Sequence, residues 1–240
     1  MIYRDQAPYV TVVIPVYDEE TILESAVREL LGRLDRFGWS YELVLSENGS
    51  TDATRQIASD LAREFPQVRQ LNTEGANYGR ALQRGILEAR GQYVICDEID
   101  LCDTDFYQRA MAILETGGTD FVVGSKVAAG SEDQRPLVRR LGTLIINGLL
   151  RALLGFKGTD THGLKAFRRR ALSDLAERCV VDRDLFASEF VIRSERAGIG
   201  IREIPVRVLE KRPPSIHLLR RVPNVLFNMG RLVLAIRLKS

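Results

Sequence analysis

The first half of the chain alternates between short apolar runs and helical repeats. Residues 9–16 (YVTVVIPV) form a continuous β-branched run, the pattern of a strand covered on both faces, which we expect Pro15 to end. Residues 19–36 then repeat apolar side chains at the spacing of an amphipathic helix, and Gly38 follows as a stop signal. The same alternation predicts strands at 41–46, 68–71 and 93–96, a helix capped by Ser50 or Thr51, and a helix at 76–89. This order requires parallel strands joined by right-handed crossovers, so the sequence predicts a layered α/β fold.

The second half is less regular and ends in a break. Helical spacing is found at 105–115, 137–154, 168–177 and 186–197, and strand-like runs at 121–124 and 201–208. The strongest punctuation in the chain is Arg212-Pro213-Pro214. We therefore expect one domain, large enough to be catalytic, over residues 1–212 and a separate basic amphipathic segment over residues 213–240.

Charge divides the chain at the same place. The 240 residues carry a formal net charge of +2, yet residues 211–240 contain seven Lys and Arg and no acid. Two interpretations of this basic tail stay open: a helix that lies on anionic lipid with snorkelling cations, or a helix that packs on the domain with a solvated basic face. Nucleic-acid binding is disfavoured because the body is acidic and the basic residues lack an aromatic stacking platform.

Composition excludes several other kinds of site. The three cysteines are widely spaced and odd in number, which argues against a disulfide framework or a structural zinc site. Two histidines leave little material for a histidine-rich metal site or a His-based triad. The start of the chain does not resemble a secretory signal, and no uncharged run reaches the roughly 18–20 residues of a membrane span. We expect a cytoplasmic protein.

Acidic residues gather where three of the predicted strands end: Asp18, Glu19 and Glu20 after the first, Glu47 and Asp52 around the second, and Asp97, Glu98, Asp100 and Asp103 after the fourth. One such cluster alone is typical of a solvated helix N-terminus. The carboxyl ends of parallel strands meet at one edge of the sheet, where ligands bind. Glu98 and Asp100 can point the same way along an extended segment, where they suit Mg²⁺ or Mn²⁺, hard cations that bridge to phosphates.

A series of motifs occurs in a familiar order: VVIPVYDEE (12–20), SENGSTD (46–52), DEIDL (97–101), GSK (124–126), DTHGLKAFRRRAL (160–172) and ASEFVIRSERAGIGIREIPVRV (187–208). In this order, and over about residues 9–212, the chain resembles family 2 glycosyltransferases. It is most similar to the branch of dolichol-phosphate mannose synthase and bacterial polyprenyl-phosphate glycosyltransferases. The resemblance implies a GT-A fold, a Rossmann-like α/β/α sandwich with a mostly parallel sheet, here followed by the basic amphipathic C-terminal helix.

The resemblance also implies a donor site. The nucleotide-sugar pocket would be lined by Pro15, Tyr17, Asp18, Glu19, Glu47, Asn48, Asp52, Asp97 and Glu98. The metal would be held by Glu98 and Asp100, or by Asp97 under a one-residue shift. Glu47-Asn48 replaces the usual Asp-Asp pair and Glu98 replaces the first aspartate of the metal motif. The usual Gly-x-Ser-Lys after Arg212 is replaced by Pro213-Pro214-Ser215-Ile216, a departure on the acceptor side.

The implied reaction is inverting transfer from a nucleotide-diphospho-sugar, with Asp100, Lys126 and Asp160 as catalytic candidates. The acceptor-binding candidates are Arg139, Arg140, Lys165 and Arg212. A hydroxyl acceptor needs a general base, for which Asp160 and His162 compete, whereas a polyprenyl phosphate is already an anionic nucleophile. The sequence leaves open a polyprenyl phosphate acceptor at an anionic membrane surface, a hydroxyl acceptor, and a silent nucleotide-sugar-binding module. It predicts no oligomeric state.

Overall fold

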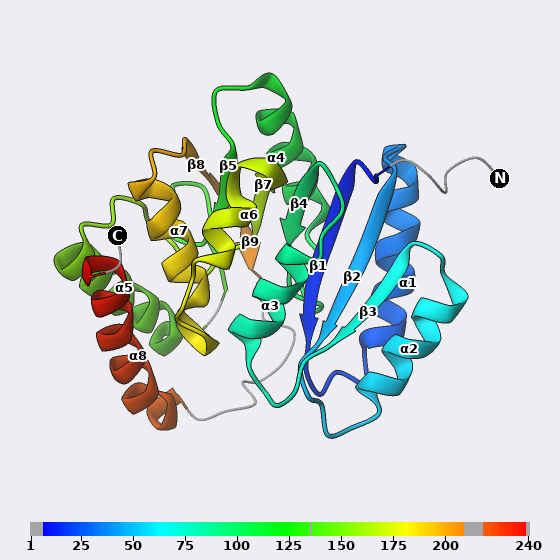
Figure 1. The fold of residues 1–240 in the computed structure, drawn as a ribbon, viewed down its shortest axis with the longest axis horizontal. Coiled ribbons are helices and arrows are strands. Elements are labelled where there is room, and N and C mark those ends of the chain that lie inside the picture. Colours follow the sequence, from blue (N-terminus) through cyan, green and yellow to red (C-terminus); the bar gives the residue numbers. More distant parts are fainter. Residues whose placement is uncertain (1–6, 135, 209–217, 239–240) are drawn as a thin grey trace.

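The computed structural model describes residues 7–134, 136–208 and 218–238, which fold around a seven-stranded sheet of order β3-β2-β1-β4-β7-β5-β8 (Figure 1). The strands of this sheet are β1 (Val10–Val16), β2 (Tyr41–Glu47), β3 (Val68–Asn72), β4 (Tyr93–Cys96), β5 (Phe121–Ser125), β7 (Lys165–Arg168) and β8 (Ile201–Pro205). The pairs β1–β2, β2–β3, β1–β4 and β5–β8 are parallel, and β7 is antiparallel to both of its neighbours. A separate two-stranded ladder joins β6 (Glu132–Asp133) to β9 (Arg207–Val208).

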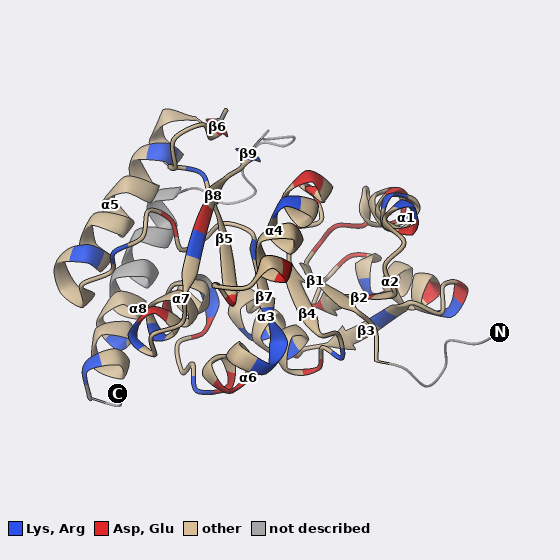
Figure 2. Ribbon diagram, turned by 90° about the horizontal axis from the view of Figure 1, so that it is seen from above, with Lys and Arg blue, Asp and Glu red and all other residues tan. Residues whose placement is uncertain are grey.

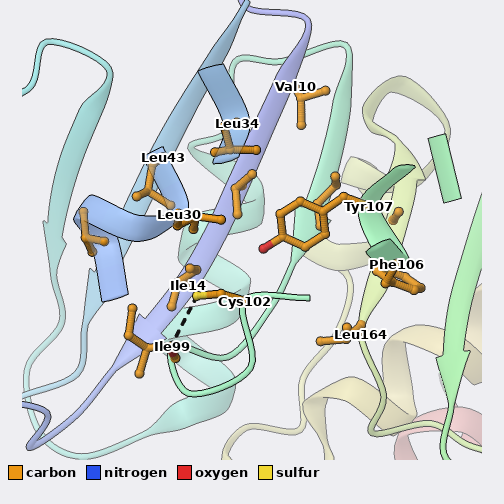
Figure 3. Close-up of a cluster of buried hydrophobic side chains, with 14 of the residues drawn as sticks. Val10, Ile14, Leu30, Leu34, Leu43, Ile99, Cys102, Phe106, Tyr107 and Leu164 are labelled. Atoms are coloured by element: carbon orange, nitrogen blue, oxygen red, sulfur yellow. Dashed lines mark hydrogen bonds between the residues drawn. The ribbon is translucent and has the colours of Figure 1, made fainter. Parts of the chain in front are cut away.

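Helices cover both faces of the sheet. They are α1 (Leu23–Leu34), α2 (Thr54–Glu64), α3 (Tyr78–Leu87), α4 (Thr104–Thr116), α5 (Leu137–Leu154), α6 (Arg169–Glu177), α7 (Phe186–Arg196) and α8 (Leu218–Leu238), with 3-10 turns η1 (Asp35–Phe37) and η2 (Arg183–Leu185). Successive residues of β1 serve the two layers in turn, since Ile14 packs toward α1, α2 and α4 while Val13 packs toward α3, α6 and α7. Figure 3 shows the first layer, where Leu30 and Leu34 of α1 lie in the same apolar cluster as Val10 and Ile14 of β1. This α/β/α sandwich confirms the predicted fold class.

Most predicted elements are present, and the differences have local causes. Pro15 does not end the first strand: it lies buried within β1 and pairs with Ser46 of β2. Neither Ser50 nor Thr51 caps α2, because the first helical amide, that of Thr54, is bound by Asp52 Oδ1 at 2.9 Å. The strand expected over 201–208 divides into β8 and β9. Strand β7 was not predicted.

The described part of the basic tail forms α8, which begins at Leu218 and includes Pro223. Its described apolar side chains Met229, Leu232 and Ile236 are buried in the same cluster as α7. The Arg196 guanidinium, on α7, also donates to the Ile236 carbonyl near the end of α8, at 3.2 Å. The packed interpretation of the tail is therefore right for this part of it. None of the helices in the described part of the chain has the length and apolarity of a bilayer-spanning segment.

Candidate active site

The loops that follow β1 and β2 are tied together by reciprocal hydrogen bonds. Asp18 adopts a left-handed backbone, with φ at 51°, and its Oδ1 accepts from the Thr51 amide at 2.8 Å. In the same direction, Glu20 Oε2 accepts from the Ala53 amide at 3.0 Å, and in the opposite direction Asp52 Oδ2 accepts from the Glu20 amide at 3.1 Å. Burial raises the pKa of Asp52, but hydrogen bonds from Thr54 and the Glu20 amide outweigh it and leave this pKa below its ordinary value. The two loops form one rigid rim at the carboxyl edge.

The remaining donor-site candidates on this rim differ in exposure. Tyr17 is 40% exposed directly after β1, whereas Pro15 is buried in the strand. Glu19 is half-buried, and its amide donates to Thr54 Oγ1 at 2.6 Å. Tyr17 is thus the member of this group whose ring is available to a ligand at the edge.

Glu47 and Asn48 are buried and hold neighbouring backbone. Glu47 is fully buried at the end of β2, where Oε2 accepts from Arg55 Nε at 3.0 Å and Oε1 accepts from the Ser50 amide at 2.5 Å. Asn48 Oδ1 accepts from the Asn77 amide at 2.6 Å and thereby fixes the start of α3. In the Glu-Asn pair that replaces Asp-Asp, Glu47 therefore orders the turn between β2 and α2, and Asn48 joins that turn to the start of α3.

The acidic segment after β4 is a turn rather than the extended segment that we expected. The amides of Leu101 and Cys102 both donate to the Glu98 carbonyl, at 3.0 and 3.2 Å. Ile99 points into the core, where Cys102 Sγ donates to its carbonyl at 3.4 Å (Figure 3). With Ile99 anchored, Glu98 is exposed and Asp100 half-exposed.

Asp97 anchors this turn from below. Its Oδ1 accepts from the Glu98 amide at 2.6 Å, while Oδ2 accepts from the Asp103 amide at 2.9 Å and from the Tyr107 hydroxyl at 2.6 Å. Burial raises the pKa of Asp97 to about 7. Both oxygens are engaged inside the protein, so Glu98 and Asp100 are the carboxylates that face outward. No group of three or more His, Cys, Asp or Glu side chains in the described residues is arranged to hold a metal ion.

A buried ion pair lies further along the same edge, between β5 and the segment before β7. Asp160 is fully buried; its Oδ2 accepts from the Lys126 amide at 3.1 Å and lies 3.6 Å from Lys126 Nζ. Its Oδ1 accepts from the His162 amide at 2.9 Å, and Lys126 Nζ donates to the His162 carbonyl at 3.1 Å. Burial raises the pKa of Asp160, but Lys126, His162 and the two amides outweigh it, and the net pKa is lowered.

Lys165 opens β7 and pairs in register with Cys96, at the end of β4. Its side chain is buried, and Nζ donates to the Gly163 carbonyl at 2.7 Å. Burial lowers the pKa of Lys165 to about 8, against the opposing influence of Cys96 and Asp160. Lys126, Asp160 and Lys165 therefore place two cations and one carboxylate in a largely buried cluster at the edge.

Glu203, which no sequence motif singled out, supports this cluster. From β8, its Oε1 accepts from the Thr159 amide at 2.6 Å and the Asp160 amide at 3.3 Å, and its Oε2 accepts from Thr159 Oγ1 at 2.6 Å. Thr159 Oγ1 also lies 2.6 Å from Ser125 Oγ, at the end of β5. The only sign of Glu203 in the sequence is that it is the single acid of the strand segment IREIP.

The other acceptor-side candidates are not brought into this network. Arg140 is exposed in the first turn of α5. The side chain of Arg139 and the whole of Arg212 lie outside the described residues, as does the predicted boundary at 212–213.

Comparison with known proteins identifies the family. The profile of glycosyl transferase family 2 matches residues 11–176. The chain is 29% identical to the glycosyltransferase AglD of Haloferax volcanii over 89% of its own length and 35% of that protein. It is 27% identical to dolichyl-phosphate beta-glucosyltransferase ALG5A of Trichomonas vaginalis over 85% of its own length and 67% of that protein.

The fold is similar to that of a solved structure. Glucosyl-3-phosphoglycerate synthase from Mycobacterium tuberculosis, in complex with Mn²⁺, uridine diphosphate and glucosyl-3-phosphoglycerate, superposes with a TM-score of 0.66 at 18% identity. The superposition covers 95% of this chain and 80% of the other. The fold is that of this GT-A structure, and by its matched segment the chain belongs to glycosyl transferase family 2.

Proposed function

We propose that this protein is an inverting glycosyltransferase that moves a sugar from a nucleotide-diphospho-sugar to a polyprenyl phosphate, with Mg²⁺ or Mn²⁺ as cofactor. The donor would bind across the rim formed by the loops after β1 and β2 and the acidic turn after β4. In the transfer, an acceptor phosphate oxygen forms a bond to the anomeric carbon as the bond from that carbon to the β-phosphate oxygen breaks. The leaving group is the nucleoside diphosphate.

The acidic turn has the ligands that such a cofactor prefers. Glu98 and Asp100 offer hard oxygen atoms on the outward side of a turn that Ile99 and Asp97 anchor. Magnesium and similar ions commonly take one or two carboxylates from the protein and complete their coordination with substrate phosphates and water, so two outward carboxylates fit. When bound, the ion would neutralise the charge that develops on the departing diphosphate.

The lowered pKa and the hydrogen bonds of Asp160 favour a phosphate acceptor over a hydroxyl acceptor. A general base must accept a proton, and Asp160 has a lowered pKa, two engaged oxygens and a cation 3.6 Å away. It is therefore suited to position Lys126 rather than to deprotonate a hydroxyl group. A phosphate needs no base, and the cations Lys126 and Lys165 are the groups that would attract it. The relative named as a dolichyl-phosphate glucosyltransferase supports the same acceptor class.

A thermal-shift panel of GDP-, UDP- and dTDP-sugars with and without Mn²⁺ tests the donor side, because a ligand that binds only the native state raises its stability. We expect one nucleotide class to raise the melting temperature, with a Mn²⁺-dependent increment that Asp100→Asn and Glu98→Gln lose. Glu88→Gln, an exposed acid at the end of α3, is the matched control and should retain it. The proposal fails if no nucleotide sugar stabilises the protein. Stabilisation without turnover would instead indicate a silent binding module.

A further inference from the structure

The outer face of α5 is a continuous apolar surface. Its side chains are Leu137, Val138, Leu141, Leu144 and Ile145, which recur at helical spacing and are between 52 and 76% exposed. Scattered exposed apolar residues are ordinary, but five on one face of one helix form a patch of the kind that marks an interaction site. We call this set the α5 outer face.

The opposite side of the same helix is firmly packed. Asn147, Leu150 and Leu154 are buried, and the two leucines belong to the apolar cluster that includes α7 and α8. The helix therefore already satisfies the core with one face. Burial within the domain does not account for the apolar character of the other face.

The charge around the α5 outer face is positive. Residues 134–159 contain five Lys and Arg and no acid, and α8, which packs beside α5, belongs to a segment that also lacks acids. Both views place α5 and α8 together at one end of the molecule, and Figure 2 shows basic positions and no acidic ones along α5. Phe227 and Leu234 of α8 add further exposed apolar side chains.

We infer that the α5 outer face docks on the surface of an anionic bilayer. Apolar side chains flanked by cations, with no acid among them, match the acyl and headgroup layers of such a surface. A second copy of the chain would bring two cationic faces together, which like-charge repulsion disfavours. One of the two interpretations of the sequence placed membrane contact in the tail. The structure buries the described apolar residues Met229, Leu232 and Ile236 of that tail, whereas the α5 outer face is exposed.

The helix also connects this surface to the ion-pair cluster. Asn147 Nδ2 donates to the Thr159 carbonyl at 2.7 Å, next to Asp160, and Arg151 NH2 donates to the Gly158 carbonyl at 2.9 Å. In a chain docked through the α5 outer face, the helix that contacts the bilayer would therefore also be hydrogen-bonded to the segment that precedes Asp160. This connection rests on the proposed lipid-phosphate acceptor, whereas the docking surface itself does not.

Vesicle co-sedimentation of the full chain tests the docking surface. We expect binding to phosphatidylglycerol-containing vesicles that weakens with added NaCl and is much weaker with phosphatidylcholine alone. The double variant Leu141→Glu, Ile145→Glu should lower the affinity at least about thirtyfold, because two half-exposed aliphatic side chains no longer enter the lipid. Leu87→Glu, an exposed leucine on α3, is the matched control and should bind like the wild type. A serine pair at the same two positions separates lost apolar contact from added negative charge.

Absence of wild-type binding to anionic vesicles at low salt would overturn the inference, as would unchanged binding of the double variant. A wild-type dimer in light scattering that the double variant dissociates, without vesicle binding, would assign the face to a second copy instead. Binding requires no donor. Vesicle binding without any sugar transfer would therefore refute the proposed function and leave the docking surface standing.

Discussion

The buried pair Lys126–Asp160 gives the most quantitative prediction. The two charged atoms lie 3.6 Å apart, and the side chains of Lys126 and Asp160 are 12% and 0% exposed. At an effective dielectric constant of about 20 their attraction is about 5 kcal/mol before desolvation is subtracted. Removing one partner leaves the other charge buried, so we expect Asp160→Asn and Lys126→Met each to lower the free energy of unfolding by about 3 kcal/mol.

A double-mutant cycle isolates the interaction. Urea unfolding at pH 7 of the wild type, both single variants and the double variant should give a coupling energy of about 2 kcal/mol. The same cycle on Arg109 and Asp105, an exposed pair on α4 at 2.8 Å, should give about 0.4 kcal/mol. A Lys126–Asp160 coupling energy no larger than that of the exposed pair would mean that the two side chains do not form an ion pair in the folded protein.

The buried pair also predicts that the free energy of unfolding depends on pH in the acid range. The pKa of Asp160 is lower in the folded protein than its ordinary value of 3.8, so its contribution is complete above about pH 4 and is lost as the pH falls further. The Asp160→Asn variant should lack this part of the acid-induced loss. Equal slopes of stability against pH below 4 for the two proteins would contradict the assignment.

Three further outcomes follow from neighbouring residues. Because burial lowers the pKa of Lys165 from 10.5 to about 8, the free energy of unfolding should rise by about 3 kcal/mol between pH 8 and 10.5. Urea titrations of Lys165→Met should lack this rise. The same variant should show lower turnover in a transfer assay. Glu203→Gln should cost about 2 kcal/mol, since it weakens hydrogen bonds to a charged acceptor, and should reduce transfer while donor binding in the thermal-shift panel is retained. Gly49→Ala should cost about 3 kcal/mol and weaken donor binding, because φ is +73° and a Cβ would lie 2.8 Å from the Gly75 amide nitrogen. Gly38→Ala, with φ at +68° and open space around it, is its control and should cost about 1 kcal/mol in the same denaturation assay.

Periodicity predicted the fold where one face of an element meets the core. The helix expected at 137–154 coincides with α5 because its apolar repeat is long and unbroken. Strand β7 was missed because its sequence, KAFR, has a basic residue at each end and runs directly into α6. Its antiparallel place between β4 and β5 depends on long-range pairing, which no local pattern encodes.

The site was predictable in position and less so in role. Parallel strands bring their carboxyl ends to one edge, so the acidic clusters after β1, β2 and β4 had to meet there. Which carboxylates are buried and which face outward depends on contacts with backbone amides that the sequence does not reveal. Glu47 and Asp97 satisfy such amides, whereas Glu98 and Asp100 face outward because Ile99 between them is buried. Glu203 acts on residues that precede it by more than forty positions, and only the fold brings them together.

Analysis of the reaction product tests the proposed transfer to a polyprenyl phosphate. Purified protein would be incubated with the nucleotide sugar selected by the thermal-shift panel, Mn²⁺ and a short polyprenyl phosphate, and the lipid fraction analysed by mass spectrometry. We expect a sugar joined to the lipid through its phosphate, with inversion at the anomeric carbon. This product should be lost in Asp100→Asn and retained in Glu88→Gln. Transfer only to hydroxyl acceptors, or no transfer from a donor that binds, would contradict the proposed transfer.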